Sequence, residues 1–163
     1  MSCTAPPDAL TGSSRAPGEL SRGCLLSPKQ LLPELLSRIE REAAHARDGR
    51  GGHMRMKCNG LSDPDVVSAL FRASQDGVRV ELVVRGVCTL RPGVAGTSEN
   101  VRVVSVLGRL LEHARVFYFA NAGAPEYYIG SADLRPRNLR RRVALLVPVK
   151  DRACRAQLDT LLD

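Results

Sequence analysis

The sequence lacks the patterns that would place the chain in or across a membrane. No apolar run approaches the ~18 residues that a membrane-spanning helix needs, and no basic patch followed by an apolar stretch opens the chain. We therefore expect neither a membrane span nor a secretory signal. GxGxxG, GxxxxGKS/T and HExxH motifs are also absent, which argues against the common dinucleotide, P-loop and zinc-protease sites.

Cysteine is scarce and poorly spaced for metal binding. The 5 cysteines are odd in number and include no CxxC pair, so neither a zinc site nor a disulfide framework is expected. This usage is typical of a reduced, cytoplasmic protein. We expect no metal ligands in this chain.

Lysine is almost absent, whereas arginine is abundant. Of the 24 basic residues only Lys29, Lys57 and Lys150 are lysines, and the net charge is +7. A planar guanidinium matches pairs of phosphate oxygens, so this excess favours anionic partners. GC-rich coding also inflates arginine, but it does not explain why five of the eight positions in 135–142 are arginine.

Length and composition predict one folded domain with a tail. The 163 residues suffice for a single core, and 44% of them are hydrophobic. Residues 1–24 are rich in Gly, Pro, Ser and Thr, and we predict that they form a disordered tail. The domain then covers residues 25–163.

Apolar periodicity predicts a mixed-sheet α/β/α sandwich. A strand, a helix and a second strand over residues 53–84 form a βαβ unit, whose two strands must be parallel. The predicted helices begin at Ser27-Pro28 and end near Gly49, run from Asp63-Pro64 to Gly77, and close the chain at Asp151–Leu161. The predicted strands are His53–Cys58, Val78–Val84, Val101–Val106, Arg115–Ala120, Tyr127–Ser131 and Val143–Val149.

Basic side chains gather where predicted strands end. Arg85 follows a parallel strand at its carboxyl end, where α/β sheets place their ligands, and Arg91 lies in the long loop Gly86–Asn100. His113 is expected at the start of a strand, and Arg142 directly precedes the last strand. Each residue alone is explained as a surface residue, but together they favour an anion site.

Three blocks in fixed order make the chain recognisable. They are VRG-x4-RPG from residue 84, SEN-x7-GR-x2-EH from residue 98 and SAD-x4-N from residue 131. The blocks closely resemble the C-terminal region of bacterial polyphosphate kinase, the ATP-dependent long-chain type. The resemblance covers roughly residues 25–163 and implies a phospholipase D-like half-domain.

The resemblance also implies an activity and roles for three residues. The chain would be a phosphotransferase that moves the γ-phosphate of ATP to polyphosphate, reversibly. His113 would be the catalytic residue that faces the transferred phosphoryl group, and Arg85, His113 and Arg142 would bind ATP or polyphosphate. We expect these three side chains to converge on one anion pocket at one edge of the sheet.

Other parts of the family's machinery are expected outside this sequence. Mg²⁺ is expected for the family, but its associated arginines and the phosphorylated histidine belong to a first half that this sequence does not contain. The expected partners are ATP, ADP and polyphosphate, together with the missing half or a second copy of the chain, and no nucleic acid. On this interpretation the chain alone is impaired as a kinase.

Two alternatives remain open. The chain could be a non-catalytic remnant that binds polyphosphate or nucleotide through its arginines. A phosphodiesterase of the phospholipase D type ranks lower, because such enzymes use a His-x-Lys pair followed by an Asp. In this sequence Arg115 stands at the position of the Lys and Ala120 at the position of the Asp. Two further positions depart from the family: Arg140 stands at a usually acidic position and Ala144 at a usual Glu.

Overall fold

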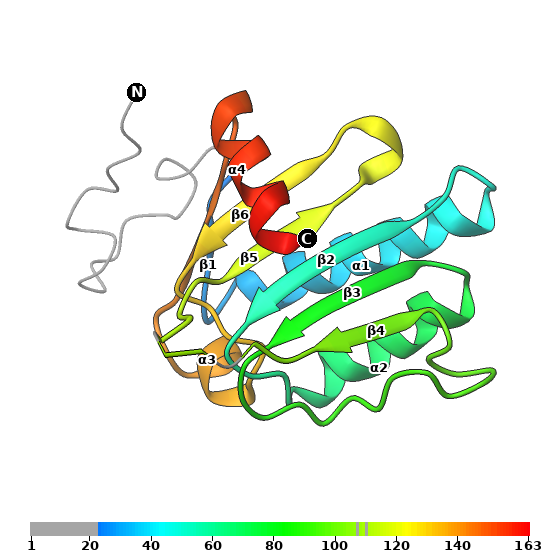
Figure 1. Cartoon of the computed structure of the whole chain (residues 1–163), viewed down its shortest axis with the longest axis horizontal. Helices are drawn as coiled ribbons and strands as arrows, with labels where there is room; N and C mark the ends of the chain where they lie inside the picture. Colours follow the sequence, from blue (N-terminus) through cyan, green and yellow to red (C-terminus); the bar gives the residue numbers. More distant parts are fainter. Residues whose placement is uncertain (1–22, 107, 110) are drawn as a thin grey trace.

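One seven-stranded mixed sheet organises the chain (Figure 1). The structure is a computed structural model that describes residues 23–106, 108–109 and 111–163. The predicted tail therefore lies outside the described residues, apart from Gly23 and Cys24. The strand order is β1-β7-β6-β5-β2-β3-β4.

Helices and strands follow one another along the chain largely in the order that the apolar periodicity predicts. Strands β2, β3 and β4 are parallel, which confirms the βαβ unit, and every other neighbouring pair is antiparallel. The strands are β1 (Leu25–Leu26), β2 (His53–Cys58), β3 (Arg79–Val84), β4 (Val101–Val104), β5 (Val116–Phe119), β6 (Glu126–Gly130) and β7 (Leu145–Pro148). The helices are α1 (Leu31–Arg47), α2 (Pro64–Gln75), the 3-10 turn η3 (Asn121–Gly123), α3 (Pro136–Arg140) and α4 (Arg152–Leu162).

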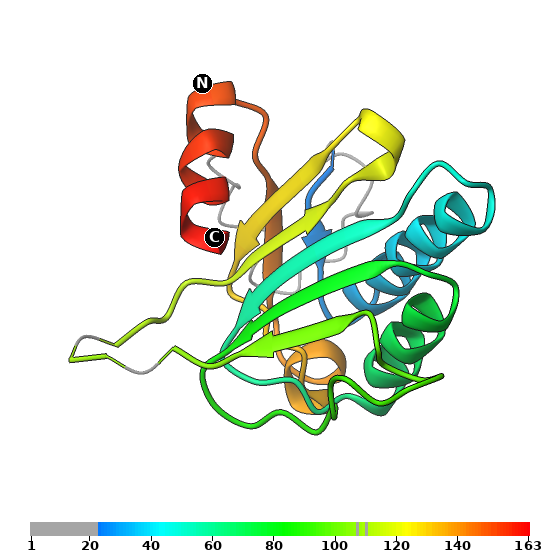
Figure 2. The ribbon, with the colours of Figure 1, turned by 45° about the vertical axis from the view of Figure 1, so that its right-hand side comes forward.

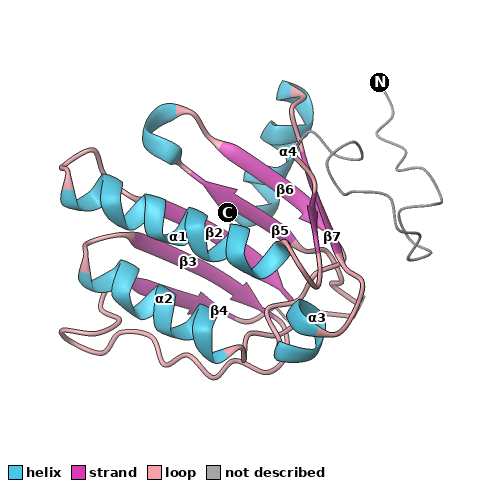
Figure 3. Ribbon diagram, turned by 180° about the vertical axis from the view of Figure 1, so that it is seen from behind, coloured by secondary structure: helices cyan, strands magenta, loops and turns pink. Residues whose placement is uncertain are grey.

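Helices cover the two faces of the sheet unequally. Helices α1 and α2 lie side by side on one face (Figure 3), where Leu35, Ile39 and Leu70 are buried against it. Helix α4 lies on the other face, where the Tyr127 hydroxyl of β6 donates to Asp159 (Figure 1). The predicted three layers are therefore present, and the third layer consists of α4 alone. On the face of the sheet that α4 covers, no described helix lies over β3 and β4.

The first helix begins later than predicted. Helix α1 begins at Leu31, and Ser27 does not cap it. Instead, the Ser27 hydroxyl donates to the main-chain oxygens of Asn138 and Leu139, both at 2.9 Å. A hydroxyl that is hydrogen-bonded to a distant segment cannot also cap the helix beside it. The sequence around Ser27 gives no sign of this distant hydrogen bond.

Several short elements differ from the prediction. Strand β1 and helix α3 were not predicted, β4 ends at Val104 instead of Val106, and β5 begins at Val116. His113 therefore lies three residues before a strand and not at its start. The sequence also predicts a short turn that leads from Leu107 to His113, and this turn starts outside the described residues. Such short elements gain their stability from tertiary contacts more than from local preference.

The connection between β4 and β5, which carries His113, projects from the body of the molecule (Figure 2). Its described residues before Glu112 are 105, 106, 108, 109 and 111, and all of them are exposed. Within the described part of the chain, none of these five residues makes a hydrogen bond. Among the described residues, the contacts that hold this connection near the sheet therefore begin at Glu112.

Gly130, the last residue of β6, lies too close to β7 for any side chain. A Cβ at this position would overlap the main-chain oxygen of Leu145, which accepts a hydrogen bond from the Ser131 amide. We expect Gly130→Ala to lower the free energy of unfolding by about 1–3 kcal/mol, because the crowded atom is backbone and cannot rotate away.

Gly60→Ala is the matched control for this prediction in urea denaturation. A Cβ at Gly60 would lie 2.9 Å from Cδ of Arg135, a flexible side chain that can move aside. The loss should therefore be clearly smaller than at Gly130. Equal losses for the two variants would contradict the prediction.

Candidate functional site

The carboxyl ends of β2 and β3 meet α3 at one end of the sheet (Figure 1). The chain after β2 pairs with the chain before α3: the Asn59 amide donates to Oδ1 of Asp133 at 2.7 Å, and the Leu134 amide donates to the Gly60 oxygen at 3.1 Å. Arg85 directly follows β3, as predicted. This is the end at which parallel strands present ligand-binding residues.

An open cavity of ≈ 670 Å³ lies beside α3. It is lined by Ser62, Asp133, Asn138 and four arginines, Arg135, Arg137, Arg141 and Arg142. We call this the arginine cavity. Within the described chain, none of the four guanidinium groups makes a hydrogen bond or ion pair, whereas Arg38, Arg47 and Arg115 each pair with a carboxylate. Four clustered cations without counter-charges can attract and hold a polyanion.

Helix α3 explains how one short run of sequence supplies all four arginines. Asn138 and Leu139 are buried and anchor the helix, which leaves Arg137 on its outer side. Arg141 and Arg142 follow the end of α3, and both their amides donate to the Arg137 oxygen, at 3.1 and 2.9 Å. Only Arg142 was predicted as a site residue.

The other three arginines were missed as individual ligands. The available signal was the density of arginine in 135–142, which the sequence also explains as a solvated face. Only the fold shows that four of the five side chains surround a cavity.

The fifth arginine of the run, Arg140, serves another purpose. It is not among the residues that line the arginine cavity. Its Nη2 lies 2.6 Å from Oδ2 of Asp65, and its Nε lies 3.2 Å from Oδ2 of the fully buried Asp63. Asp63 also caps α2, as predicted, because its Oδ1 accepts from the amides of Asp65 and Val66. Arg140 therefore ties α3 to the start of α2.

His113 is exposed and contacts one arginine side chain. Nη1 of Arg115 lies 3.1 Å from Nδ1 of His113, and Nη2 of the same guanidinium lies 2.9 Å from Oδ2 of Asp133. The guanidinium can only donate, so Nδ1 accepts and the proton of the neutral ring is on Nε2. Asp133 thus lines the arginine cavity and also holds the residue that contacts His113.

Asp133 is a buried carboxylate kept ionised by its neighbours. Burial by itself raises its pKa, but hydrogen bonds from the Arg115 guanidinium and the Asn59 amide outweigh burial, and the pKa lies below the ordinary value. Asp133 and Arg115 are both largely buried, with 9% and 10% of their side chains exposed. The pair therefore forms a rigid support between the cavity and His113.

The structure links the three predicted site residues through intermediates. Nη1 of Arg85 donates to the main-chain oxygen of Glu112 at 3.3 Å, directly before His113. Arg142 lines the cavity with Asp133, whose partner Arg115 contacts His113. None of the three contacts another directly in the described chain. Their convergence on one bound anion therefore stays a prediction.

The donors around the arginine cavity do not fit a divalent cation. No group of three or more His, Cys, Asp or Glu residues in the described ranges could hold a metal ion. The carboxylate of Asp133 is already bound by Arg115, and the remaining charged groups of the cavity are cations. Mg²⁺ prefers oxygen ligands, and the arginine cavity has no carboxylate that is free to bind it.

Comparison with known protein sequences gives concordant matches. A family model described as "Polyphosphate kinase C-terminal domain 2" matches residues 24–163. The polyphosphate kinase of Prochlorococcus marinus is 51% identical over 154 residues, which cover 94% of this chain and 21% of the relative. That of Streptomyces coelicolor is 54% identical over 154 residues, 94% of this chain and 20% of the relative. The chain thus spans about a fifth of the length of these relatives.

Solved structures show the same fold. The crystal structure of polyphosphate kinase from Porphyromonas gingivalis superposes with a TM-score of 0.83 at 38% identity, over 91% of this chain and 22% of that one. A phospholipase D family member, Nuc from Salmonella typhimurium, superposes with a TM-score of 0.60 at 18% identity, over 85% and 89% of the two chains. The second match shows the fold alone, and it confirms the predicted phospholipase D-like half-domain.

Proposed function

Since this chain belongs to the polyphosphate kinase family, in the region of its C-terminal domain, we propose that it binds polyphosphate and the phosphates of ATP between the arginine cavity and His113. The observation that carries the proposal is the cluster of four guanidinium groups that lack partners within the described chain. Phosphates satisfy such a cluster, because each guanidinium can donate two parallel hydrogen bonds to one phosphate.

The reaction proposed for this site is reversible phosphoryl transfer from ATP to polyphosphate. The bond from the γ-phosphorus to the β–γ bridging oxygen breaks, and the phosphoryl group reaches a terminal oxygen of the polyphosphate. Charge spreads over the oxygens of the phosphoryl group in transfer, and Arg85 and Arg142 stabilise it. His113 presents its Nε2–H to a phosphoryl oxygen, because Arg115 occupies Nδ1.

This chain supplies one half of the site in our proposal. The resemblance places the phosphorylated histidine and the arginines associated with Mg²⁺ in a first half, outside this sequence. The partner is therefore that half or a second copy of this chain, and Mg²⁺ enters with the nucleotide. We also propose a cytoplasmic location, from the cysteine usage, and no nucleic-acid partner. Separately, none of the described helices has the length and apolar character of a membrane span.

A phosphodiesterase activity is less well supported by the same residues. Phospholipase D-type sites use a lysine two residues after the histidine. Arg115 occupies that position here, and one of its guanidinium nitrogens is bound to Asp133. A non-catalytic binding role remains the second candidate, because binding needs only the arginines of this half.

Titration with polyphosphate tests the proposal. We expect Arg137→Gln/Arg142→Gln to weaken binding about tenfold or more, since hydrogen bonds to charged groups contribute about 1.5–3 kcal/mol each. Binding by the unchanged protein should weaken steeply with salt, because attraction between exposed charges is screened beyond about 8 Å at physiological ionic strength.

Calorimetry at several salt concentrations measures both effects. Arg152→Gln is the control, an exposed arginine at the start of α4 and outside the cavity. An equal loss of affinity in the control would remove the arginine cavity as the site. Affinity that stays flat with salt would contradict the ionic basis of binding.

A further inference from the structure

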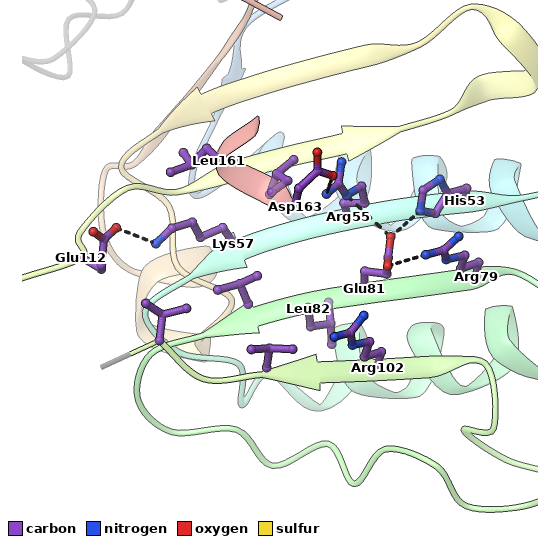
Figure 4. A pocket seen from close by; sticks show the side chains of 14 residues that line it. His53, Arg55, Lys57, Arg79, Glu81, Leu82, Arg102, Glu112, Leu161 and Asp163 are labelled. Atoms are coloured by element: carbon purple, nitrogen blue, oxygen red, sulfur yellow. Dashed lines mark hydrogen bonds and ion pairs between the residues drawn. The ribbon is translucent and has the colours of Figure 1, made fainter. Parts of the chain in front are cut away.

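Lys57 is buried although it carries a charge. It lies on β2 between β5 and β3, with Val116 and Val83 as its neighbours across the sheet. Only 5% of its side chain is exposed, and its Nζ lies 3.2 Å from Oε2 of Glu112 (Figure 4). A buried ammonium is stable only when it is paired, so the Glu112 side chain is held at the carboxyl end of β2.

Glu112 directly precedes His113 and has further contacts to the strand ends. Its main-chain oxygen accepts from Arg85 at 3.3 Å. The side-chain amide of Asn59 is oriented so that both its polar atoms are satisfied. Its nitrogen donates to the same Glu112 oxygen at 3.3 Å, and its oxygen accepts from Nε of Arg115 at 2.9 Å. The residues on both sides of His113 are thus bound to the end of the sheet.

No described residue earlier in this connection is attached in the same way. The described residues between β4 and Glu112 are exposed and have no hydrogen bonds within the described chain. Among the described residues, Lys57 provides the first side-chain attachment of the segment after β4, and this attachment is one residue from the imidazole. Loss of this attachment would leave Glu112 held to the sheet only by the hydrogen bonds that its main-chain oxygen accepts from Arg85 and Asn59, as far as the described residues show.

We propose that Lys57 is a positioning residue, which holds His113 at the phosphoryl-transfer site through Glu112. The role of His113 itself rests on the proposed function above. Lys57 touches neither phosphate nor imidazole, so its effect is on the placement and order of the segment. Placement matters because an error of about 1 Å can slow a reaction about 100-fold.

The matched control lies on the same face of the sheet. A cavity of ≈ 610 Å³ separates the Lys57–Glu112 pair from Arg79, which lies 2.7 Å from Glu81 (Figure 4). His53 also binds Glu81, at 2.8 Å. Arg79→Met thus removes a cation from the same face without touching the His113 segment, and the His53 ring reports locally on that change.

Nuclear magnetic resonance of the full chain with labelled histidine tests the proposal. The chain has 3 histidines, so His113→Gln identifies the relevant signal. In Lys57→Met and in Glu112→Gln, we expect the His113 ring signal to shift and its backbone order parameter to fall from about 0.85 to below about 0.6. The double variant should resemble either single variant, because both remove the same pair.

Titration with tripolyphosphate followed at the His113 signal adds a second readout. We expect the apparent Kd to rise about threefold or more in both variants, since an unordered segment must be immobilised on binding. In Arg79→Met the His53 signal should change, while the His113 signal and the Kd should not.

The outcomes separate this inference from the proposed function. A folded Lys57→Met or Glu112→Gln protein with an unchanged His113 signal would overturn the positioning role. If Lys57→Met fails to fold, Glu112→Gln decides, because its side chain is 41% exposed and is not needed for the core. If tripolyphosphate never perturbs His113 in the unchanged protein, the proposed function fails, while the order of the segment still tests the attachment.

Discussion

The isolated chain is expected to bind polyphosphate but to extend it at least about 1,000-fold more slowly than a full-length relative. The resemblance assigns the phosphate-carrying histidine to a half that this sequence does not contain, and His113 is the assisting group. Removing the nucleophile from a coupled pair removes most of the rate enhancement, because the partner cannot form the covalent intermediate. ATP-dependent polyphosphate synthesis measures the rate, with His113→Ala as the control.

The dependence of that rate on protein concentration separates the outcomes. Fast, His113-dependent synthesis by a monomer would contradict the prediction. A specific activity that rises with concentration would also contradict it, and would show that a second copy replaces the missing half. Binding without turnover is the expected result.

Asp133→Asn is expected to lower the free energy of unfolding by about 3–5 kcal/mol at neutral pH. The substitution leaves the guanidinium of Arg115 buried without its carboxylate, from which it lies 2.9 Å away. Asp48→Asn is the control, because Asp48 pairs with Arg50 at the surface, where such pairs contribute about 0–1 kcal/mol. Urea denaturation measures both variants, and equal losses would contradict the prediction.

The effect of Asp133→Asn should also depend on pH. The pKa of Asp133 is lower in the folded protein than its ordinary value. The stabilisation it provides is therefore present above the unfolded pKa of about 3.9 and is lost as the pH falls through the lower folded pKa. The difference in stability between the unchanged protein and Asp133→Asn should narrow below about pH 4. A difference that stays constant from pH 7 to pH 3 would show that the charge is not its source.

Local patterns predicted the elements that bury a continuous face. Within the predicted strand His53–Cys58, Met54, Met56 and Cys58 alternate with polar residues, which predicts that they face the core, and each is at most 2% exposed. Asp63-Pro64 marked the start of α2 because the cap is made within the same turn. Arg85 was placed at a strand end because a strand of known polarity has only one carboxyl end.

Elements and contacts that depend on distant partners were not predicted. Strand β1 has two residues and exists through its pairing with β7, more than a hundred positions away. Lys57 stands between Met56 and Cys58, where the alternation predicts the exposed face of the strand, yet it is buried with Glu112 from the connection between β4 and β5. Neither the pairing of β1 nor the burial of Lys57 leaves a periodic signal in the sequence.

The arginines show most clearly what the amino-acid sequence determined and what the tertiary structure determined. By itself, the sequence determined that guanidinium groups cluster in 135–142 and that the chain carries the three family blocks. The tertiary structure decided which of these cations remain available to an anion. Arg140 is neutralised by Asp63 and Asp65, whereas Arg142, two residues on, lines the arginine cavity. The charge available at a site depends on which carboxylates the fold brings within contact distance, and these two carboxylates lie at the start of α2, far from the arginines in sequence.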